Sequence, residues 1–247
     1  MRKNSGKLDD LYLLGLGIRG LRQLTLETRD VLKKCRVILH IGEDHKGLKK
    51  LNPNVVDIAS LYWRKEARSK VYKELKKRVV DEIGNGPGVA MVTYGHPLFF
   101  DDVNLSLWNH CRRRKLSCTM LPAVSCLDTM SVDLGIDYSD GTQILEATTA
   151  VRENAMLCPN MHVMMLQIGE YNWAFTSDAL KKHPGHYRSF INYMQKFYPR
   201  NHKVQVVYSQ DGEDNVLKKK IALHQLDSIR EEMFPGTTLY VPPVKQR

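Results

Sequence analysis

The sequence lacks the features that would place the protein in a membrane or give it a disulfide framework. No apolar run approaches the roughly 20 residues needed to span a bilayer. The apolar stretch after the opening MRKNSGKLDD is too short for a secretory signal. The 5 cysteines are odd in number and form no CxxC pair, so neither disulfides nor a zinc site is indicated. We therefore expect a cytoplasmic protein with free thiols and no metal site.

Acidic residues are also scarce relative to basic ones. There are 27 Asp and Glu against 37 Lys and Arg, which gives a formal net charge of +10. This excess attracts anionic partners, either an acidic peptide or a nucleic acid. The basic residues fall in separate clusters, and neither a zinc finger nor an aromatic-interleaved RNA-binding signature accompanies them. Most are therefore expected to form solvated helix faces.

Alternating strand and helix patterns predict an α/β fold. At 247 residues the chain can form one large domain or two of ordinary size. A strand over residues 11–17, a helix beginning after Thr25 and a strand over 36–42 predict parallel strands with a right-handed connection. Further strands are predicted near 55–58, from 89, up to 121, and over 142–147, 162–169, 203–209 and 237–243. Helices are predicted from about 64, 102 and 125, with one ending near 198 and a polar one over 216–233. We place the domain boundary at Pro122.

The stretch VAMVTYGHPLFF, residues 89–100, is the centre of the predicted chemistry. Its apolar start is typical of a strand buried on both faces. Polar groups follow at the carboxyl end, where open α/β sheets bind ligands. Gly95 would let backbone approach a ligand closely, and Pro97 would hold His96 extended, so that Tyr94 and His96 face a crevice. The same residues also fit an ordinary strand-to-helix turn.

Other candidate residues carry weaker signals when taken one at a time. Gly15 and Gly17 form only a fragment of a dinucleotide-binding fingerprint. Ser125, at a helix start, would offer backbone N–H groups to a ligand or act as a simple N-cap. Gln167 is polar within a largely apolar strand, and a buried amide needs partners, either from a ligand or from neighbouring backbone.

The basic helix predicted from about residue 64 contains a second candidate group. Its buried stripe repeats every four residues, at Val71, Leu75, Val79 and Ile83. Arg68 and Tyr72 would lie side by side on it, with Tyr62 just before the helix. A guanidinium next to a phenol stabilises phenolate, which makes tyrosine a usable base. Because a basic helix places some arginine near some tyrosine by chance, these residues alone favour a solvated face.

In order and spacing, the motifs resemble those of the tetrapyrrole-methylase-like S-adenosylmethionine methyltransferases, and most of all the borosin peptide backbone α-N-methyltransferases. The resemblance covers nearly the whole chain, through GLGIRGLRQLTLE, LNPNV, YGHP, PAVSC, DLGID with EATT, QIG and TLYVPP. Ile18 and Arg19 fit the borosin form better than the Pro-Gly form of porphyrinoid methylases. Tyr62, Arg68 and Tyr72 fall where borosin enzymes carry their catalytic set, which favours the functional interpretation of that helix.

The resemblance implies a two-domain α/β enzyme, with domains 1–121 and 122–247 and S-adenosylmethionine in the cleft between them. Aromatic faces near the cationic sulfonium of this cofactor are chemically sensible. Leu98, where the family commonly has glycine, and Phe99 depart from the family pattern, and both would narrow the methionine pocket. The implied cofactor-binding residues are Gly15, Gly17, Tyr94, His96, Pro97, Phe99, Ser125, Cys126 and Gln167.

The implied reaction is methyl transfer to a peptide backbone nitrogen, with S-adenosylhomocysteine as product. This nitrogen is a poor nucleophile because its lone pair is delocalised into the carbonyl. The amide must therefore lose its proton or be held as an imidate. The hypothesis assigns Tyr72, activated by Arg68, as base or relay, and Tyr62 as hydrogen-bond donor to the substrate carbonyl.

The implied partners are a precursor peptide and a second copy of the chain. Fused borosins continue beyond the TLYVPP strand into a substrate segment, whereas only residues 244–247 follow here. We therefore expect a split system with a separate precursor, whose acidic stretches would meet the basic surface, and a homodimer as in the family. Two alternatives stay open: a methyltransferase acting on a small molecule or a tetrapyrrole, and a non-catalytic basic module that binds nucleic acid.

Overall fold

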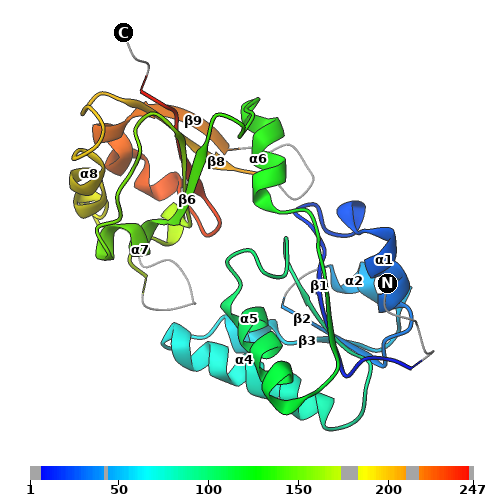
Figure 1. The fold of residues 1–247 in the computed structure, drawn as a ribbon. Helices are drawn as coiled ribbons and strands as arrows, with labels where there is room; N and C mark the ends of the chain where they lie inside the picture. Colours follow the sequence, from blue (N-terminus) through cyan, green and yellow to red (C-terminus); the bar gives the residue numbers. More distant parts are fainter. Residues whose placement is uncertain (1–6, 42–43, 174–182, 210–216, 245–247) are drawn as a thin grey trace. The chain divides into compact units, whose positions relative to one another are not determined.

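A computed structural model describes residues 7–41, 44–173, 183–209 and 217–244, without the side chain of Leu217 (Figure 1). The chain divides into two compact units: unit 1 runs to Thr129, and unit 2 begins at Met130. Each unit contains its own five-stranded sheet. The predicted α/β class is therefore confirmed. The limits of the two domains at residues 121 and 122 stay a prediction.

Unit 1 contains a parallel sheet in the strand order β3-β2-β4-β1-β5. Its strands are β1 (Leu11–Gly15), β2 (Val37–His40), β3 (Val55–Asp57), β4 (Val89–Thr93) and β5 (Cys118–Leu121). Strands β4 and β1 lie side by side in the middle of the sheet. After β1 the chain goes on to β2 on one side of this pair, and after β4 it goes on to β5 on the other side. The carboxyl ends of β1 and β4 therefore form the switch point at which such sheets bind ligands.

Helices cover both faces of this sheet. They are η1 (Gly20–Gln23), α1 (Leu26–Leu32), α2 (His45–Leu51), α3 (Ala59–Tyr62), α4 (Arg68–Ile83) and α5 (Asp102–Arg114). Helix α6 (Cys126–Leu134) follows β5 and continues into unit 2. Alternate residues of each strand face different cores. Leu13 and Met91 belong to the core under α4 and α5, whereas Leu14 and Val92 belong to the core under α1 and α2. Figure 1 shows these two helix pairs on opposite sides of the strands.

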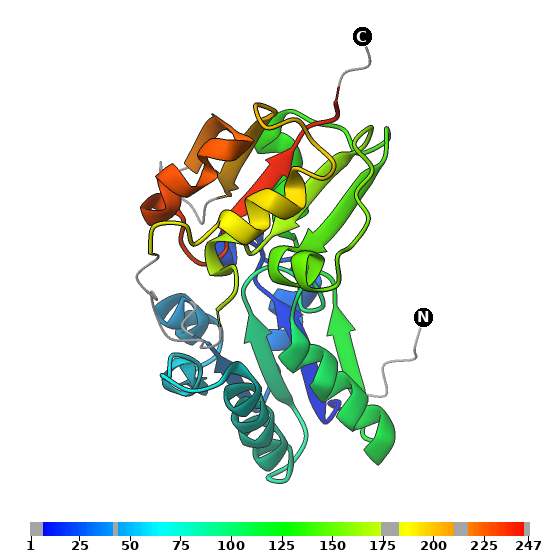
Figure 2. The same ribbon diagram turned by 90° about the vertical axis from the view of Figure 1, so that its left-hand side faces the viewer.

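Unit 2 contains a mixed sheet in the order β6-β7-β10-β8-β9, in which β6 and β7 are parallel and the other pairs antiparallel. Its strands are β6 (Thr142–Glu146), β7 (His162–Leu166), β8 (Lys203–Tyr208), β9 (Leu217–Ala222) and β10 (Thr238–Val241). Its helices are α7 (Ala147–Arg152), η2 (Ile168–Glu170), α8 (Arg188–Met194) and η3 (Leu223–Glu232). One core joins α7, α8 and η3 to the sheet, and Figure 2 shows α8 in yellow and η3 in orange.

Several predicted elements are confirmed. Thr25 caps α1 by accepting a hydrogen bond from the Thr28 N–H at 3.1 Å. All four residues of the predicted α4 stripe are buried, namely Val71, Leu75, Val79 and Ile83. Helical periodicity therefore identified the buried face of α4, although the helix begins at Arg68 rather than near residue 64.

The polar helix predicted over 216–233 is wrong in its first part; Val216 itself lies outside the described residues. Residues 217–222 form β9, which pairs with β8 along its whole length and precedes η3. The three lysines of this segment suit an edge strand, where charged side chains discourage pairing with another molecule. Elsewhere β7 ends at Leu166 and α8 at Met194, both earlier than predicted.

All cysteines are free thiols, and Cys35, Cys111 and Cys118 are buried. No helix among the described residues is long and apolar enough to cross a membrane. No group of three or more potential metal ligands occurs in the described ranges.

Candidate active site

A tight backbone contact joins the carboxyl ends of β1 and β4. The Gly17 N–H donates to the Gly95 carbonyl at 3.3 Å, and the Gly95 N–H donates to the Gly17 carbonyl at 3.1 Å. Both residues have positive φ, 74° and 68°, a conformation that favours glycine. A Cβ on Gly15 would lie 2.1 Å from the Gly95 carbonyl oxygen. The three glycines therefore let the loops after β1 and β4 pack backbone against backbone at the switch point.

Gln23 fixes the loop that follows β1. Its Oε1 accepts hydrogen bonds from the Ile18 N–H at 2.7 Å and from the Arg19 N–H at 2.8 Å. A Cβ on Gly17 would lie 2.7 Å from the Gln23 Cβ, so the side chain is packed closely under the loop. Sequence reasoning missed this residue, since its only signal is its place six residues after Gly17.

His96 forms a turn in which its ring is oriented by the backbone. The His96 Nδ1 accepts from the Leu98 N–H at 3.1 Å, and the Phe99 N–H donates to the His96 carbonyl at 3.0 Å. A neutral His96 therefore carries its proton on Nε2, where it can donate to a ligand. Pro97 between them is buried.

The same loop exposes large apolar side chains. Tyr94, Leu98 and Phe100 are 42%, 45% and 43% exposed. The Phe99 and Phe100 rings meet edge to face, with centroids 5.0 Å apart. Positive φ occurs at Phe100 and not at Leu98, so the backbone here does not require the glycine that the family commonly has at position 98.

A buried hydrogen-bond cluster closes the base of this loop. Asp101 caps α5 by accepting from the Asn104 N–H at 2.8 Å. The Asn104 Nδ2 donates to the Asp101 Oδ2 at 2.9 Å and to the Thr93 Oγ1 at 3.2 Å. Burial raises the pKa of Asp101 to about 6. The cluster ties the end of β4 to the start of α5, and sequence reasoning missed it, although an aspartate before a helix is an N-cap signal.

The structure brings two of the predicted catalytic residues into contact. Tyr62 ends α3 and Tyr72 lies in the second turn of α4, with their ring centroids 6.3 Å apart and their planes at 21°. Arg68 begins α4 and lies one helical turn before Tyr72. Both tyrosines are partly buried against the core under α4 and α5. An ion pair between Arg64 and Glu74, with a closest distance of 2.6 Å, fixes the segment that joins the two helices.

Ser125 and Cys126 lie at the start of α6. The Ser125 N–H and hydroxyl donate to the Asp128 Oδ2 at 2.6 and 2.8 Å, so the serine amide is occupied by a residue of its own helix. This is the N-terminal half of a capping box, with the acidic residue reaching back to the N-cap. Burial raises the pKa of the Cys126 thiol to about 12. Cys126 is therefore a neutral thiol rather than a nucleophile.

Gln167 is the predicted site residue that belongs to unit 2; all the others belong to unit 1. It follows β7 in the left-handed conformation, with φ 56°, and is half-buried. Such a conformation is uncommon for a residue other than glycine, asparagine or aspartate. A pocket of about 390 Å³ in unit 2 contains none of the predicted residues; it is lined by Pro184, Gly185, Arg188, Ile191 and Asp227.

A parallel sheet with glycine loops at its switch point defines a ligand-binding α/β fold. This fold is similar to that of uroporphyrin-III-C-methyltransferase from Thermus thermophilus, with a TM-score of 0.68 and 17% identity over 94% of this chain and 93% of that one. It is also similar to that of cobalt precorrin-4 methyltransferase, with a TM-score of 0.65 and 14% identity over 94% of each chain.

The family model of the tetrapyrrole (corrin/porphyrin) methylases matches residues 10–192. The chain therefore belongs to this methyltransferase family, whose members generally use S-adenosylmethionine.

Curated relatives extend the similarity to borosin proteins. The chain is 25% identical to a methyltransferase/type I borosin cyclic peptide precursor of Coprinopsis marcescibilis, over 96% of this chain and 63% of that protein. It is 26% identical to a methyltransferase/type III borosin precursor of Anomoporia bombycina, over 94% of this chain and 28% of that protein. The chain thus spans less than two thirds of the length of these relatives. The predicted resemblance to borosin methyltransferases is confirmed as a distant one.

Proposed function

We propose that the protein transfers methyl groups from S-adenosylmethionine to backbone amide nitrogens of a separate precursor peptide. The observation that carries the proposal is the stacked pair of Tyr62 and Tyr72, with Arg68 one turn away. The similarity to borosin proteins over 96% of the chain supports a peptide substrate.

The switch-point loop of unit 1 fits the cofactor. Gly15 and Gly17 let the loops after β1 and β4 pack closely, Tyr94 presents an exposed ring, and His96 presents an Nε2 donor. When bound, S-adenosylmethionine supplies an electrophilic methyl group on a cationic sulfonium. We assign its binding to Gly15, Gly17, Tyr94, His96, Pro97, Phe99, Ser125, Cys126 and Gln167.

The tyrosines and Arg68 prepare the amide nitrogen. Tyr72 accepts the amide proton at its phenolate oxygen, and the Arg68 guanidinium stabilises that phenolate. Tyr62 donates its hydroxyl hydrogen to the substrate carbonyl oxygen, where negative charge collects as the imidate forms. The rings of Tyr62 and Tyr72 stack, and this holds their hydroxyl groups in a fixed relative position. The peptide bond of the substrate would thus be oriented between Tyr72 as base and Tyr62 as hydrogen-bond donor.

The test is tandem mass spectrometry of the short peptide encoded beside this gene, after incubation with the protein and S-adenosylmethionine. We expect methyl groups on backbone nitrogens, and Tyr72→Phe should lower the rate by about 100-fold or more because a general base is lost. Isothermal titration should show unchanged binding of S-adenosylmethionine by the variant.

Tyr198→Phe is the matched control, because the buried Tyr198 hydroxyl has no hydrogen-bond partner among the described residues. It should retain full activity. An unmodified peptide in the presence of folded, cofactor-binding protein would instead favour a small molecule or a tetrapyrrole as substrate. Salt-dependent retention of DNA or RNA without methyl transfer to a peptide would favour the nucleic-acid module.

A further inference from the structure

Helices α4 and α5 carry a surface on which positive charges face one another. The two helices share one core, so their outer faces adjoin. Burial lowers the pKa of His110, and the nearby charges of Lys76, Arg114 and Arg113 lower it further. The lysine of α4 and the arginines of α5 therefore act on the same imidazole. We call Lys76, Arg113 and Arg114 the basic strip.

The acidic residues on and just before α4 do not neutralise this strip. The acids in α4 and just before it are bound to other cations, in the pairs Glu66–Lys70, Glu74–Arg64, Asp81–Lys77 and Glu82–Arg78. No Asp or Glu occurs between residues 103 and 127. Within the described ranges, the three strip residues form no ion pair.

The position of the strip links it to the candidate active site. Arg68, Tyr72 and Lys76 follow one another at four-residue spacing and thus share one face of α4. At 1.5 Å per residue, Lys76 lies about 6 Å along the helix from Tyr72. His110, Arg113 and Arg114 share a face of α5 by the same rule. The strip therefore continues the line of the candidate catalytic residues toward the end of α5.

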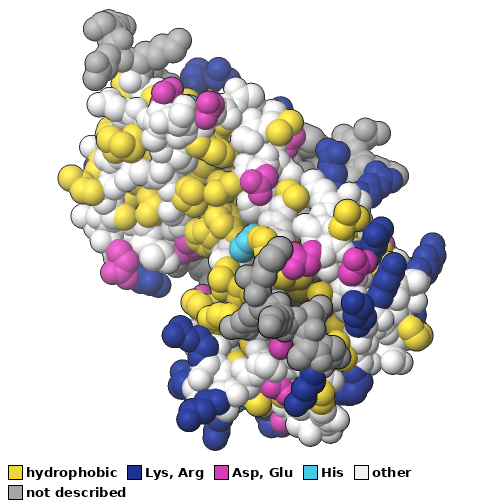
Figure 3. All heavy atoms as spheres, turned by 45° about the vertical axis from the view of Figure 1, so that its right-hand side comes forward, with side chains coloured by type: hydrophobic (Ala, Val, Ile, Leu, Met, Phe, Trp, Pro, Cys, Tyr) yellow, Lys and Arg dark blue, Asp and Glu magenta, His cyan; other side chains and the backbone are white. Residues whose placement is uncertain are grey.

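Helix stability explains only part of this arrangement. The negative end of the α5 dipole favours Arg113 and Arg114 in the last turn. It does not explain Lys76 in the middle of α4, where its charge adds to the same positive field. Mutual repulsion lowers the stability of the free protein, and an anionic partner would relieve it. Figure 3 shows that Lys and Arg side chains, in dark blue, lie in several separate groups on the face it presents.

We propose that the basic strip docks an acidic segment of the peptide substrate, next in sequence to the stretch that is methylated. This inference rests on the proposed function. Guanidinium groups bind carboxylates in a bidentate manner, which suits Glu and Asp side chains. On α4 and α5 the aromatic rings of Tyr72 and Trp108 are partly buried against the core, which leaves less ring surface for stacking bases than charge for binding carboxylates. An acidic peptide therefore fits the strip better than a single-stranded nucleic acid.

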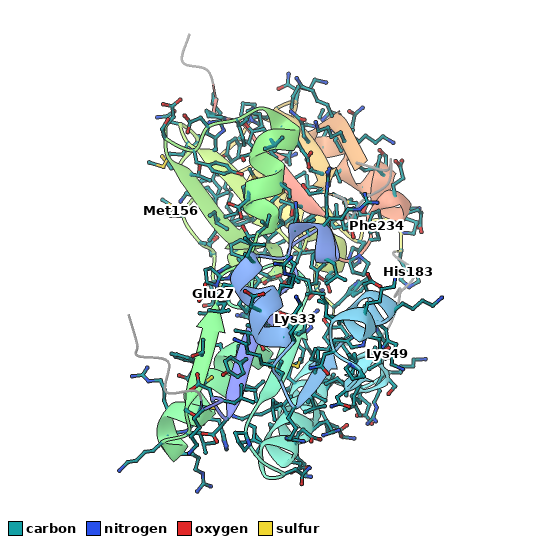
Figure 4. All side chains as sticks on the ribbon, turned by 90° about the vertical axis from the view of Figure 1, so that its right-hand side faces the viewer. Glu27, Lys33, Lys49, Met156, His183 and Phe234 are labelled. Carbon is teal, nitrogen blue, oxygen red and sulfur yellow. The ribbon has the colours of Figure 1, made fainter. Side chains whose placement is uncertain are left out.

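The experiment compares two variants with equal changes in charge. In the first, Lys76, Arg113 and Arg114 are all replaced by Gln. In the second, Lys33, Lys34 and Lys49 are replaced by Gln, on exposed positions of α2 and of the residues after α1 (Figure 4). Fluorescence anisotropy measures binding of a labelled peptide of alternating Glu and Ser, of a neutral Gly and Ser peptide, and of a labelled oligothymidylate.

The wild type should bind the Glu and Ser peptide and not the neutral one. The strip variant should bind it about tenfold more weakly at low salt, and the control variant should stay within about twofold of the wild type. The difference should shrink at high salt because exposed charges are screened. An equal loss of affinity in both variants would show that only net charge matters, and it would contradict the proposal that the strip is a docking surface. Tighter binding of oligothymidylate, lost in the strip variant, would make the strip a nucleic-acid surface instead.

A kinetic readout separates this inference from the proposed function. The substrate is the peptide that the wild-type protein methylates. For this peptide the strip variant should have a higher KM than the wild type and the same kcat, because the strip binds the peptide away from the reacting amide. Methylation with an unchanged KM would overturn the docking role and leave the proposed function standing. Strip-dependent binding of the acidic peptide without any methylation would overturn the proposed function, and the strip would then bind an acidic peptide that is not a methylation substrate.

Discussion

The two units show how strand direction decides where functional groups gather. In unit 1 all strands are parallel, so every carboxyl end lies at one edge of the sheet, and loops distant in sequence meet there, such as those of Gly17 and Gly95. In unit 2 the antiparallel β10 separates β7 from β8, and carboxyl ends lie at both edges. Unit 2 accordingly contributes Gln167 to the predicted site, whereas unit 1 contributes every other residue.

The largest expected effect is that of replacing one glycine in each unit by alanine, which tests the difference between the two sheets. A Cβ on Gly15 would lie 2.1 Å from the Gly95 carbonyl oxygen, and a Cβ on Gly169 would lie 1.9 Å from the Phe234 carbonyl oxygen. Replacing either by Ala should cost about 3 kcal/mol, because backbone must move in both cases. Only Gly15→Ala should also abolish binding of S-adenosylmethionine, since that loop lies at the switch point.

Urea denaturation and isothermal titration would measure the two effects. Gly84→Ala is the control, because its Cβ would lie 3.2 Å from a single carbonyl oxygen and Gly84 has helical φ and ψ. Equal loss of cofactor binding in folded Gly15→Ala and Gly169→Ala would contradict this difference between the units. The loop after β7 would then be as important for cofactor binding as the loop after β1.

The second prediction compares an ion-pair network of unit 1 with a single pair of unit 2. Arg36 and Arg78 both bind Glu82, at 2.8 and 2.9 Å, and these hydrogen bonds lower the pKa of Glu82 to about 2. Glu82→Gln should therefore cost about 2 to 3 kcal/mol at neutral pH. The exposed pair of Lys219 and Glu232 should be worth less than about 1 kcal/mol, so Glu232→Gln is the matched change.

The pH dependence follows from the lowered pKa of Glu82. Its stabilisation is present above the usual glutamate pKa of 4.5 and is lost as the pH falls toward about 2. The difference between wild type and Glu82→Gln should therefore shrink in acid, measured by thermal unfolding at several pH values. Equal costs for Glu82→Gln and Glu232→Gln would show that the network adds nothing beyond a surface pair.

Periodic patterns made much of unit 1 predictable from the sequence. Val71 and Val79 repeat at helical spacing, and they lie in the core. The apolar run of β4 predicted a strand buried on both faces, and the structure places β4 beside β1 in the middle of the sheet. The position of Tyr94 and His96 at the carboxyl end of that strand followed directly from the direction of the chain.

Contacts between distant segments could not be predicted in the same way. The ladder between β8 and β9 decides the state of residues 217–222, and a lysine-rich segment gives no sign of its partner. The Arg36–Glu82 pair joins residues far apart in sequence, and the bond from Asn104 to Thr93 joins α5 to the end of β4 across a loop. The stacking of Tyr62 on Tyr72 depends on the bend between α3 and α4, which helical spacing does not reveal.

The smallest predicted effect compares two carboxylates that cap helices and whose pKa values are shifted in opposite directions. Burial raises the pKa of Asp101 in unit 1 to about 6, from a usual value of 3.8. Burial also raises the pKa of Glu146, which caps α7 in unit 2, but hydrogen bonds from Thr149 and Thr148 outweigh it and leave this pKa lowered. The ionised form is thus disfavoured in the first cap and favoured in the second.

The wild type therefore loses stability as the pH rises from 3.8 through about 6, because Asp101 ionises less readily in the folded state than in the unfolded state. Asp101→Asn removes this loss and should stabilise the protein by about 1 kcal/mol near neutral pH and by less in acid. The gain is smaller than the pKa shift alone would give: a flip of the Asn104 side chain offers its Oδ1 to the new NH₂ group, but it moves the Asn104 Nδ2 to a buried place with no hydrogen-bond partner among the described residues. Glu146→Gln should do the reverse and destabilise more at neutral pH than in acid. Urea midpoints of the two variants at both pH values measure the contrast, and a shift of the same sign in both would show that the caps do not differ in the way that burial and hydrogen bonding predict.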